Sequence, residues 1–194
     1  MARAEHLVPF VFRWEDGVPA SWSDRPLAEQ FAKAKEKGLV VLPSDKGGPT
    51  VCGVTYTTYS QWCRKQGKKA PTPEEMVLMS WEEWFALFRG LFWDRVRADE
   101  IGSQAVADML VDWCWTSGVP WPVRRLQRVL CVKQDGVVGP KTIHELNCWD
   151  GDTLAAELAD QRRQYYTDIA KRNPSQAKFL QGWLNRTNDC IRWK

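Results

Sequence analysis

The first candidate for chemistry is a carboxyl side chain near the N-terminus, Glu15, with Trp14 before it and Asp16 and Gly17 after it. Cleavage of a glycosidic bond requires a protonated acid beside the leaving oxygen and usually a second carboxylate across the sugar. An apolar ring and a second negative charge both favour the protonated form of a carboxyl, and this segment offers both. Composition alone does not select Glu15 among 24 acidic residues, so an ordinary surface glutamate remains the alternative.

A second group of candidates lies in a stretch rich in turn residues. Residues 43–55 have the sequence Pro-Ser-Asp-Lys-Gly-Gly-Pro-Thr-Val-Cys-Gly-Val-Thr. Glycine accepts positive φ angles, so such a turn brings the backbone close to a ligand, although ordinary hairpin turns use the same residues. The stretch therefore predicts a turn that presents one carboxylate and several hydroxyl groups.

The elements on either side must position these candidates. Apolar residues recur at helical spacing over 7–14 and predict an amphipathic helix that ends near Glu15. A second helix is expected over 23–37, and residues 39–42 and 50–55 predict a short β-hairpin. This hairpin is the one convincing strand pattern in the sequence.

Helices dominate the remainder of the chain. Thr72 with Glu75 and Ser80 with Glu83 have the spacing of capping boxes, which mark helix starts. An apolar run over 101–113 predicts a central helix. Further helices are expected at 122–130, 140–147, 153–171 and 175–193.

Composition limits the class of protein. With 194 residues and 44% hydrophobic residues, the chain can bury a core as one domain, with or without a closely packed extension. No apolar run is long enough for a membrane span, and no signal peptide is recognisable, so we expect synthesis in the cytoplasm. The net charge of +3 is too small for a nucleic-acid footprint.

Ordinary structural roles account for the cysteines and tryptophans. The six cysteines lack CxxC spacing and are expected to be mostly buried free thiols, without a metal site. Twelve tryptophans suit a sugar-binding cleft because flat rings stack on sugar faces, but core packing is the usual role of a tryptophan.

Five motifs in order carry a resemblance to a known family. Residues 12–17 are similar to a motif with the core E-G-G, and residues 45–55 to D-x-G-G-x-T-x-x-G-x-T. Residues 108–118 and 126–142 resemble two later segments, and residues 182–186 match G-W-x-N-R. The chain thus resembles glycoside hydrolase family 108, which contains phage and prophage N-acetylmuramidases, some labelled putative secretion activator proteins, with a C-terminal predicted peptidoglycan-binding region.

The resemblance implies roles for particular residues. It implies that Glu15 is the catalytic acid, and that Asp45 and Thr50 hold the attacking water. Contacts to the substrate are expected from Gly47, Gly48, Gly53, Thr55, Trp113 and Asn185, although Asn185 could equally cap or pair within the last helices.

Two departures from the family pattern concern the carboxylates. Asp16 replaces the second residue of E-G-G, and the gap between Glu15 and Asp45 is much longer than usual in the family. An inserted helix between Val18 and Leu42 explains the length. Asp24 lies at the family's usual distance from Glu15, but we prefer Asp45 because it keeps the Gly-Gly turn and the threonine.

The expected protein is therefore a mainly α, lysozyme-like fold with one short β-hairpin next to the active site. Residues 1–118 would form the catalytic region and residues 119–194 a peptidoglycan-binding helical region packed on it. We expect a monomer that cleaves the β-1,4 bond between N-acetylmuramic acid and N-acetylglucosamine in peptidoglycan glycan strands, with no cofactor, metal or nucleic acid.

Three further expectations complete the hypothesis. Action on the cell wall in the periplasm would require release through a holin-like partner, another export device or cell lysis. A non-catalytic peptidoglycan-binding or secretion-associated protein is one alternative function. A lytic transglycosylase that uses Glu15 alone is the other.

Overall fold

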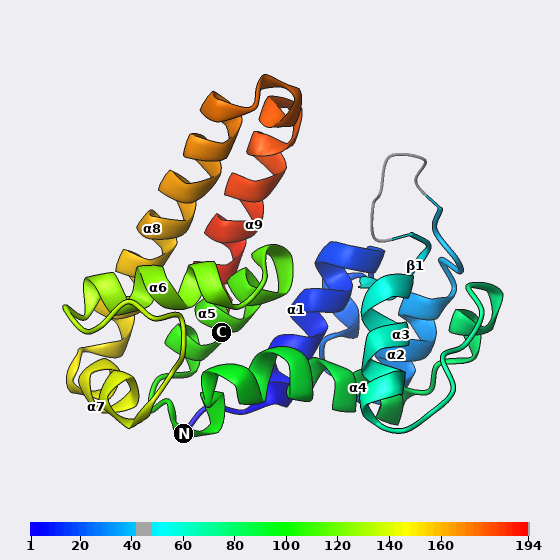
Figure 1. Cartoon of the computed structure of the whole chain (residues 1–194). Coiled ribbons are helices and arrows are strands. Elements are labelled where there is room, and N and C mark those ends of the chain that lie inside the picture. The colour runs from blue at the N-terminus through cyan, green and yellow to red at the C-terminus, as the bar shows by residue number, and fades with distance from the viewer. Residues whose placement is uncertain (42–47, 194) are drawn as a thin grey trace. The chain divides into compact units, whose positions relative to one another are not determined.

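The computed structural model describes residues 1–41 and 48–193, which form two compact units (Figure 1). The hairpin unit comprises Val8–Phe88, and the helical unit comprises Met1–Leu7 together with Arg89–Lys194. Among the described residues, helices predominate and one two-stranded sheet is present. The expected mainly α architecture with one short hairpin is confirmed.

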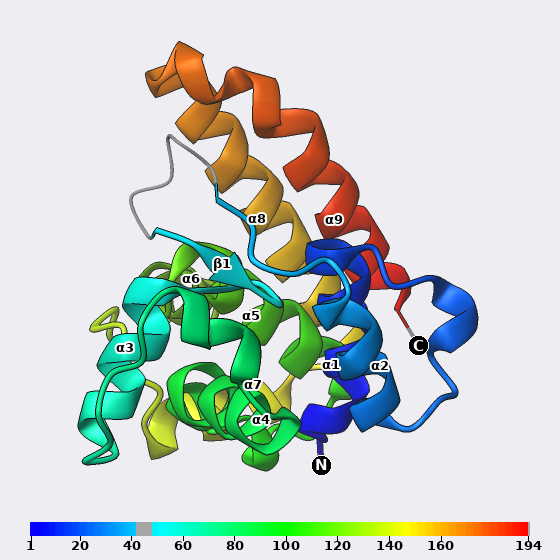
Figure 2. The ribbon, with the colours of Figure 1, turned by 90° about the vertical axis from the view of Figure 1, so that its right-hand side faces the viewer.

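The hairpin unit contains most of the first helix and the three that follow. The helix expected over 23–37 begins later because Pro26, in an extended conformation, immediately precedes its first turn. The sequence analysis missed a helix directly after the hairpin, although Tyr59, Trp62 and Cys63 recur there at helical spacing and are buried. Figure 2 shows the elements of this unit: α1 (Ala4–Asp16), the 3-10 helix η1 (Ala20–Trp22), α2 (Leu27–Lys35), β1 (Thr50–Val51), β2 (Val54–Thr55), α3 (Tyr56–Lys65), the 3-10 helix η2 (Glu74–Leu78) and α4 (Trp81–Phe88).

The β-hairpin differs in register from the one expected. β1 and β2 pair directly, Val51 with Val54, around a two-residue turn of Cys52 and Gly53. These turn residues have φ of +48° and +72°, the positive values that a type I′ turn requires. The expected pairing with residues 39–42 is limited to one bridge between Val40 and Thr50. The sequence 50–55 therefore folds back on itself instead of forming one strand.

An aromatic cluster forms the core of the hairpin unit and fixes the turn. The Trp84 ring lies 4.6 Å from that of Phe12 and 5.4 Å from that of Phe88, centroid to centroid. Its indole Nε1 donates a hydrogen bond of 2.9 Å to the backbone oxygen of Cys52. Because this indole is fully buried, the turn is anchored to the core.

Both capping boxes are confirmed. The Thr72 and Glu75 side chains each bond the other residue's backbone N–H, and Ser80 and Glu83 do the same. The second box opens α4, as expected. The first opens only the 3-10 helix η2, so a capping box fixed the start but not the type of this helix.

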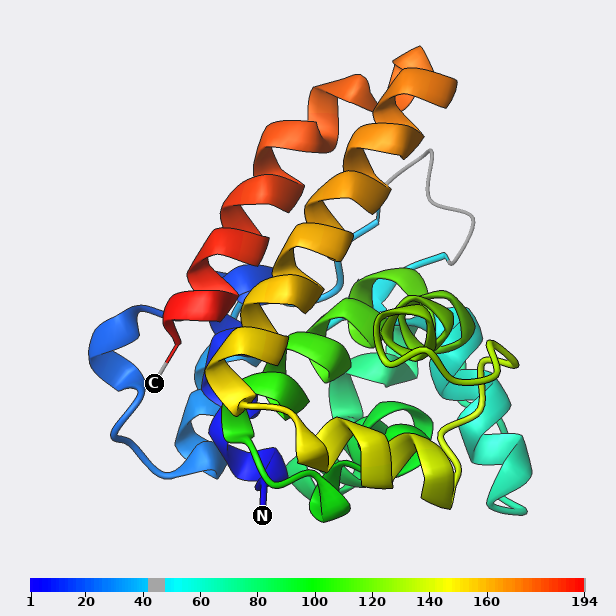
Figure 3. The same cartoon turned by 90° about the vertical axis from the view of Figure 1, so that its left-hand side faces the viewer.

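The helical unit is built around α5, whose residues 106–114 are all buried. Two long helices, α8 and α9, lie side by side (Figure 3). The expected helix over 175–193 begins instead with a 3-10 segment that starts at Pro174. The elements are the π-helix η3 (Arg89–Trp93), the 3-10 helices η4 (Asp94–Val96) and η5 (Ala98–Glu100), then α5 (Gln104–Ser117), α6 (Pro120–Val129), α7 (Pro140–Cys148), α8 (Gly151–Arg172), the 3-10 helix η6 (Pro174–Phe179) and α9 (Leu180–Arg192).

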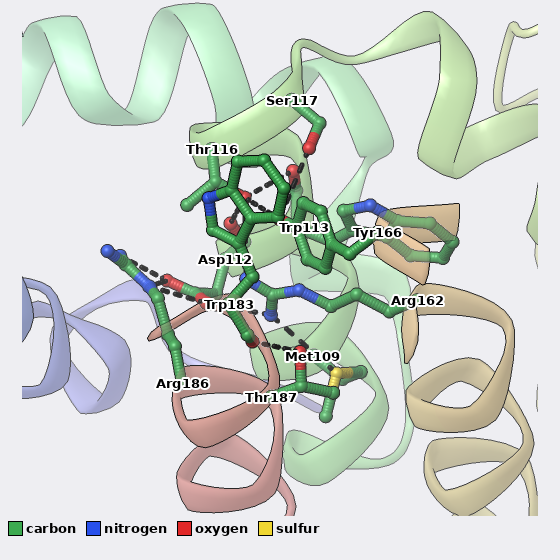
Figure 4. Close-up of polar contacts among 10 residues, drawn as sticks. All are labelled: Met109, Asp112, Trp113, Thr116, Ser117, Arg162, Tyr166, Trp183, Arg186 and Thr187. Carbon is green, nitrogen blue, oxygen red and sulfur yellow. Dashed lines mark hydrogen bonds and ion pairs between the residues drawn. The ribbon is translucent and has the colours of Figure 1, made fainter. Parts of the chain in front are cut away.

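A charged cluster lies in the core of the helical unit (Figure 4). Asp112 of α5 has no exposed surface and accepts hydrogen bonds from Arg186 of α9, the shortest at 2.7 Å. Arg162 of α8, also fully buried, lies 2.8 Å from the other carboxylate oxygen. Burial by itself would raise the pKa of Asp112, but the charges of Arg186 and Arg162 outweigh it and lower that pKa. The carboxylate therefore ties three helices together in its ionised form.

The cysteines and the helices' hydropathy complete the description. Cys52, Cys63, Cys114 and Cys190 are buried, as expected for most of the six thiols, whereas Cys131 and Cys148 are exposed. Within the described residues, none of the helices combines the length and the apolar character needed to cross a membrane.

Candidate active site

Glu15 lies in the last turn of α1 and is partly buried. The helix ends at Gly17, whose φ of +73° is a left-handed conformation that glycine adopts without strain. From beyond α2, the Lys37 ammonium donates a 2.6 Å hydrogen bond to the backbone oxygen of Glu15. A lysine at this place offsets the negative end of the helix dipole. The main chain that carries Glu15 is thus held from two sides.

Asp16, the next residue, carries the most perturbed carboxyl of the site. Burial, and then the negative charge of Glu15, raise its pKa to about 7, against the opposing charge of Lys37. Its Oδ2 atom is buried and has no hydrogen-bond partner among the described residues. Below neutral pH Asp16 is therefore largely uncharged, and the pair of adjacent carboxyls does not carry two full negative charges.

The hairpin turn lies within electrostatic reach of this helix end. The pKa of the Cys52 thiol is raised, first by burial and then by the charge of Asp16, while Lys35 and Lys37 act in the opposite direction. The hairpin turn is thus coupled electrostatically to Asp16 and to two lysines. The expectation of a hairpin close to Glu15 agrees with this arrangement.

Trp14 supplies the aromatic neighbour that the sequence suggested. It is partly buried, and its ring lies 6.3 Å from that of Phe10. Its indole Nε1 is a second buried polar atom without a partner in the described structure. Buried polar groups are normally hydrogen-bonded, so two exceptions flanking Glu15 mark this helix end as unusual.

The hairpin residues expected to act on substrate are placed as follows. Thr50 is partly buried, and its hydroxyl donates a long hydrogen bond of 3.4 Å to the backbone oxygen of Gly48. Gly48 and Gly53 both have positive φ, at +78° and +72°. Thr55 is the N-cap of α3, its hydroxyl accepting the N–H of Thr58, so this residue has a structural role already.

The partner carboxylate of Glu15 is not settled by the described residues. Asp45 and Gly47 lie outside them. Asp24 is described and is exposed between η1 and α2. The preference for Asp45 over Asp24 therefore stays a prediction.

The two remaining expected contacts belong to the helical unit. Trp113 of α5 is fully buried, which leaves no indole surface for a sugar to contact in this structure. Asn185 of α9 is exposed, and its side-chain oxygen accepts a 2.8 Å hydrogen bond from Gln181, one turn earlier. Neither residue is assigned a substrate contact by this geometry.

Two residues of the site escaped the sequence analysis. Lys37 follows α2 by two residues and carries no motif, and only the fold brings it to Glu15. Cys52 stands inside the hairpin motif, where the sequence marked only its neighbours. Its positive φ could not be inferred, because non-glycine residues rarely adopt that conformation.

The comparisons with known proteins agree with this description. Residues 30–118 match the model of glycosyl hydrolase 108, and residues 121–188 match a predicted peptidoglycan domain. The solved structure of SagA from Brucella abortus is similar over 84% of this chain and 92% of its own, with 29% identity and a TM-score of 0.67. A search of the curated proteins gave no match.

These matches support a glycoside hydrolase but do not identify its acid residue. The glycosyl hydrolase match contains Thr50 and the hairpin but begins after Glu15. The fold is lysozyme-like and mainly α, and the partner class is peptidoglycan. Residues 30–118 thus match glycosyl hydrolase 108 and residues 121–188 match a predicted peptidoglycan domain, and together these matches support a peptidoglycan hydrolase or a peptidoglycan-binding role.

Proposed function

We propose that this protein is an N-acetylmuramidase that hydrolyses the β-1,4 bond between N-acetylmuramic acid and N-acetylglucosamine, with Glu15 as general acid. The observation that carries the assignment is the carboxyl pair at the end of α1, where Asp16 has a pKa of about 7 beside the hairpin turn. Strongly perturbed carboxyls with a specific charged neighbour are typical of active sites. The glycosyl hydrolase 108 match supports the reaction class.

In the proposed reaction, Glu15 gives its proton to the bridging oxygen as the bond from the anomeric carbon to that oxygen breaks. A water molecule adds to the anomeric carbon and loses a proton to Asp45, so no atom of the enzyme remains bound to the sugar. Thr50 would orient that water through its hydroxyl. Asp16, neutral below pH 7, would keep the helix end from repelling the developing carboxylate of Glu15.

Replacement of the acid tests the assignment. Glu15→Gln keeps the side-chain shape but removes the transferable proton, so the rate of wall clearing should fall by about 10²- to 10⁴-fold. Clearing of purified peptidoglycan in a turbidity assay measures it. The matched control is Glu5→Gln, an exposed glutamate in the first turn of the same helix, which should clear walls at the wild-type rate.

The products separate this function from its alternatives. A folded Glu15→Gln protein with near wild-type clearing would refute the acid assignment. A wild-type protein that sediments with walls but never clears them would be a binding protein, the function that the peptidoglycan domain supports by itself. Released fragments with a 1,6-anhydro end, detected by mass spectrometry, would identify a lytic transglycosylase.

Stereochemistry tests the roles of Asp45 and Thr50. If these residues orient a water, room for it requires a distance of roughly 6.5 to 9.5 Å between the Glu15 and Asp45 carboxyls, and the product emerges as the α-anomer. Proton NMR in the first minutes of hydrolysis identifies the anomer, and Thr50→Ala should lose activity while remaining folded. A β-anomer, or inactivation by Asp24→Asn and not by Asp45→Asn, would overturn this choice of partner.

A further inference from the structure

A cavity lies in the helical unit and shares no residue with the site around Glu15. Its volume is about 550 Å³, and its lining includes His6, Ser103, Asp152, Ala155 and Trp193. A smaller cavity of about 270 Å³ also uses Ser103. Ligand pockets typically combine an apolar lining with a few convergent polar groups, and the larger cavity has this composition.

The histidine in this cavity is held rigidly. His6 Nδ1 lies 2.7 Å from Oδ2 of Asp108, which is almost fully buried. The other oxygen of Asp108 accepts a 2.8 Å hydrogen bond from Gln104. The backbone oxygen of His6 accepts a hydrogen bond of 3.0 Å from the indole of Trp193. These contacts occupy Nδ1 of the ring, and Nε2, which has no hydrogen-bond partner among the described residues, is the nitrogen that a ligand can bind.

The charge of His6 suits an anionic ligand group. The hydrogen bond to Asp108 raises its pKa, against the opposing effects of burial and of Arg3. The imidazole is about one third exposed, so it meets solvent and ligand while its carboxylate partner does not. When protonated, it donates from Nε2 to a carboxylate in a charge-assisted hydrogen bond.

The remaining walls suit the other parts of an acetylated sugar. Trp193, fixed by its hydrogen bond to His6, supplies a flat aromatic ring close to the small side chains of Ala155 and Ala156. Such a surface accommodates the C–H face of a sugar ring and an acetamido methyl group. Asp152, in the first turn of α8, offers carboxylate oxygens that accept hydroxyl hydrogens.

We propose that this cavity is a second glycan site that binds one acidic N-acetylated sugar, of the N-acetylmuramic acid type, with protonated His6 holding its carboxylate. Asp152, Ala155 and Ala156 fall inside the predicted peptidoglycan domain, whereas His6 and Trp193 come from outside its matched residues. The choice of polymer rests on the proposed function, but binding at this site does not require cleavage. The site would hold a strand that is cut elsewhere or not at all.

Titration by NMR of the full-length Glu15→Gln protein with single sugars tests this proposal, because such sugars contain no glycosidic bond that the enzyme could cleave. The chain has only two histidines, His6 and His144, so the His6 ring signals can be assigned with two variants. Saturable shifts of His6 are expected with N-acetylmuramic acid. Neutral N-acetylglucosamine, which lacks the carboxylate, should bind about tenfold or more weakly, since a charged hydrogen bond contributes about 1.5 to 3 kcal/mol.

Variants localise the binding. His6→Gln should remove the preference for the acidic sugar, while His144→Gln, at an exposed position outside the cavity, should leave it unchanged. Should His6→Gln fail to fold, Ala156→Trp fills the cavity from an exposed position and should abolish binding of both sugars. Equal affinity for the two sugars, or binding that survives Ala156→Trp, would overturn the proposal. Wall clearing by the otherwise wild-type Ala156→Trp protein reports separately on the proposed function.

Discussion

Two aspartates, one in each compact unit, respond to burial with opposite shifts in pKa. Asp112 in the helical unit is completely buried and lies between Arg162 and Arg186, and its pKa is lowered. Asp16 in the hairpin unit has a buried oxygen that makes no hydrogen bond to any residue the structure describes, and its pKa is raised to about 7. Both pay the desolvation penalty of burial, but only Asp112 is compensated by ion pairs.

The difference separates a structural carboxylate from a functional candidate. A compensated carboxylate stays ionised and is locked in place by its partners, so it serves the fold. An uncompensated carboxyl holds its proton close to neutral pH and destabilises the folded protein whenever it ionises. Unfavourably placed carboxyls of this kind are typical of active sites, and Asp16 lies directly beside Glu15.

The largest expected effect on stability comes from replacing Asp112, the aspartate whose charge is compensated by ion pairs. Asp112→Asn leaves two arginine charges in the core without their counter-ion, and we expect a loss of about 3 to 5 kcal/mol in the free energy of unfolding. Urea denaturation at pH 7 measures it. Asp16→Asn is the matched control and should not destabilise. A loss below about 1 kcal/mol for Asp112→Asn would mean that the cluster is not a structural tie.

The second effect concerns Asp16 and depends on pH. Its pKa lies at about 7 in the folded protein against an ordinary 3.8, so the folded state binds the extra proton between these values. The stability from this proton is complete below about pH 4 and is lost as pH rises through about 7. The shift corresponds to at most about 4 kcal/mol, and we expect about half, because the residue is partly exposed.

Asp16→Asn should therefore be more stable than wild type at pH 8 and differ little from it at pH 4. Thermal melts across this range provide the measurement. The asparagine imitates the protonated carboxyl, so wall clearing should persist in the variant at pH 8. Parallel stability curves for the two proteins would contradict an uncompensated carboxyl, and the contrast with Asp112 would disappear.

The smallest expected effect concerns the thiols. Free cysteines close no loops, so a reducing agent should leave the melting temperature within about a degree or two and should not activate the enzyme. This holds for Cys52 beside Asp16 as well as for Cys190 in the helical unit. A large drop in melting temperature under reduction would reveal a disulfide and would contradict the description of Cys52 and Cys190 as free thiols.

The sequence by itself determined most of the helices. Apolar spacing predicted α1 and the central α5, and the capping boxes of Ser80 and Thr72 predicted helix starts, because these patterns depend on residues within a few positions of each other. The ordered motifs indicated the family before any fold was known. Local patterns were insufficient for the folding of 50–55 into its own hairpin, which depends on a positive φ at Cys52.

Only the tertiary structure decided how the charges are compensated. Sequence marked Glu15 and its neighbour Asp16, but it could not show that Lys37 reaches Glu15 or that Oδ2 of Asp16 has no hydrogen-bond partner in the described part of the chain. It likewise marked Asp112 and Arg186 as parts of separate motifs, 74 positions apart, without pairing them. Burial and charge partners arise from contacts between distant segments, and they alone determine whether a buried carboxyl holds or loses its proton.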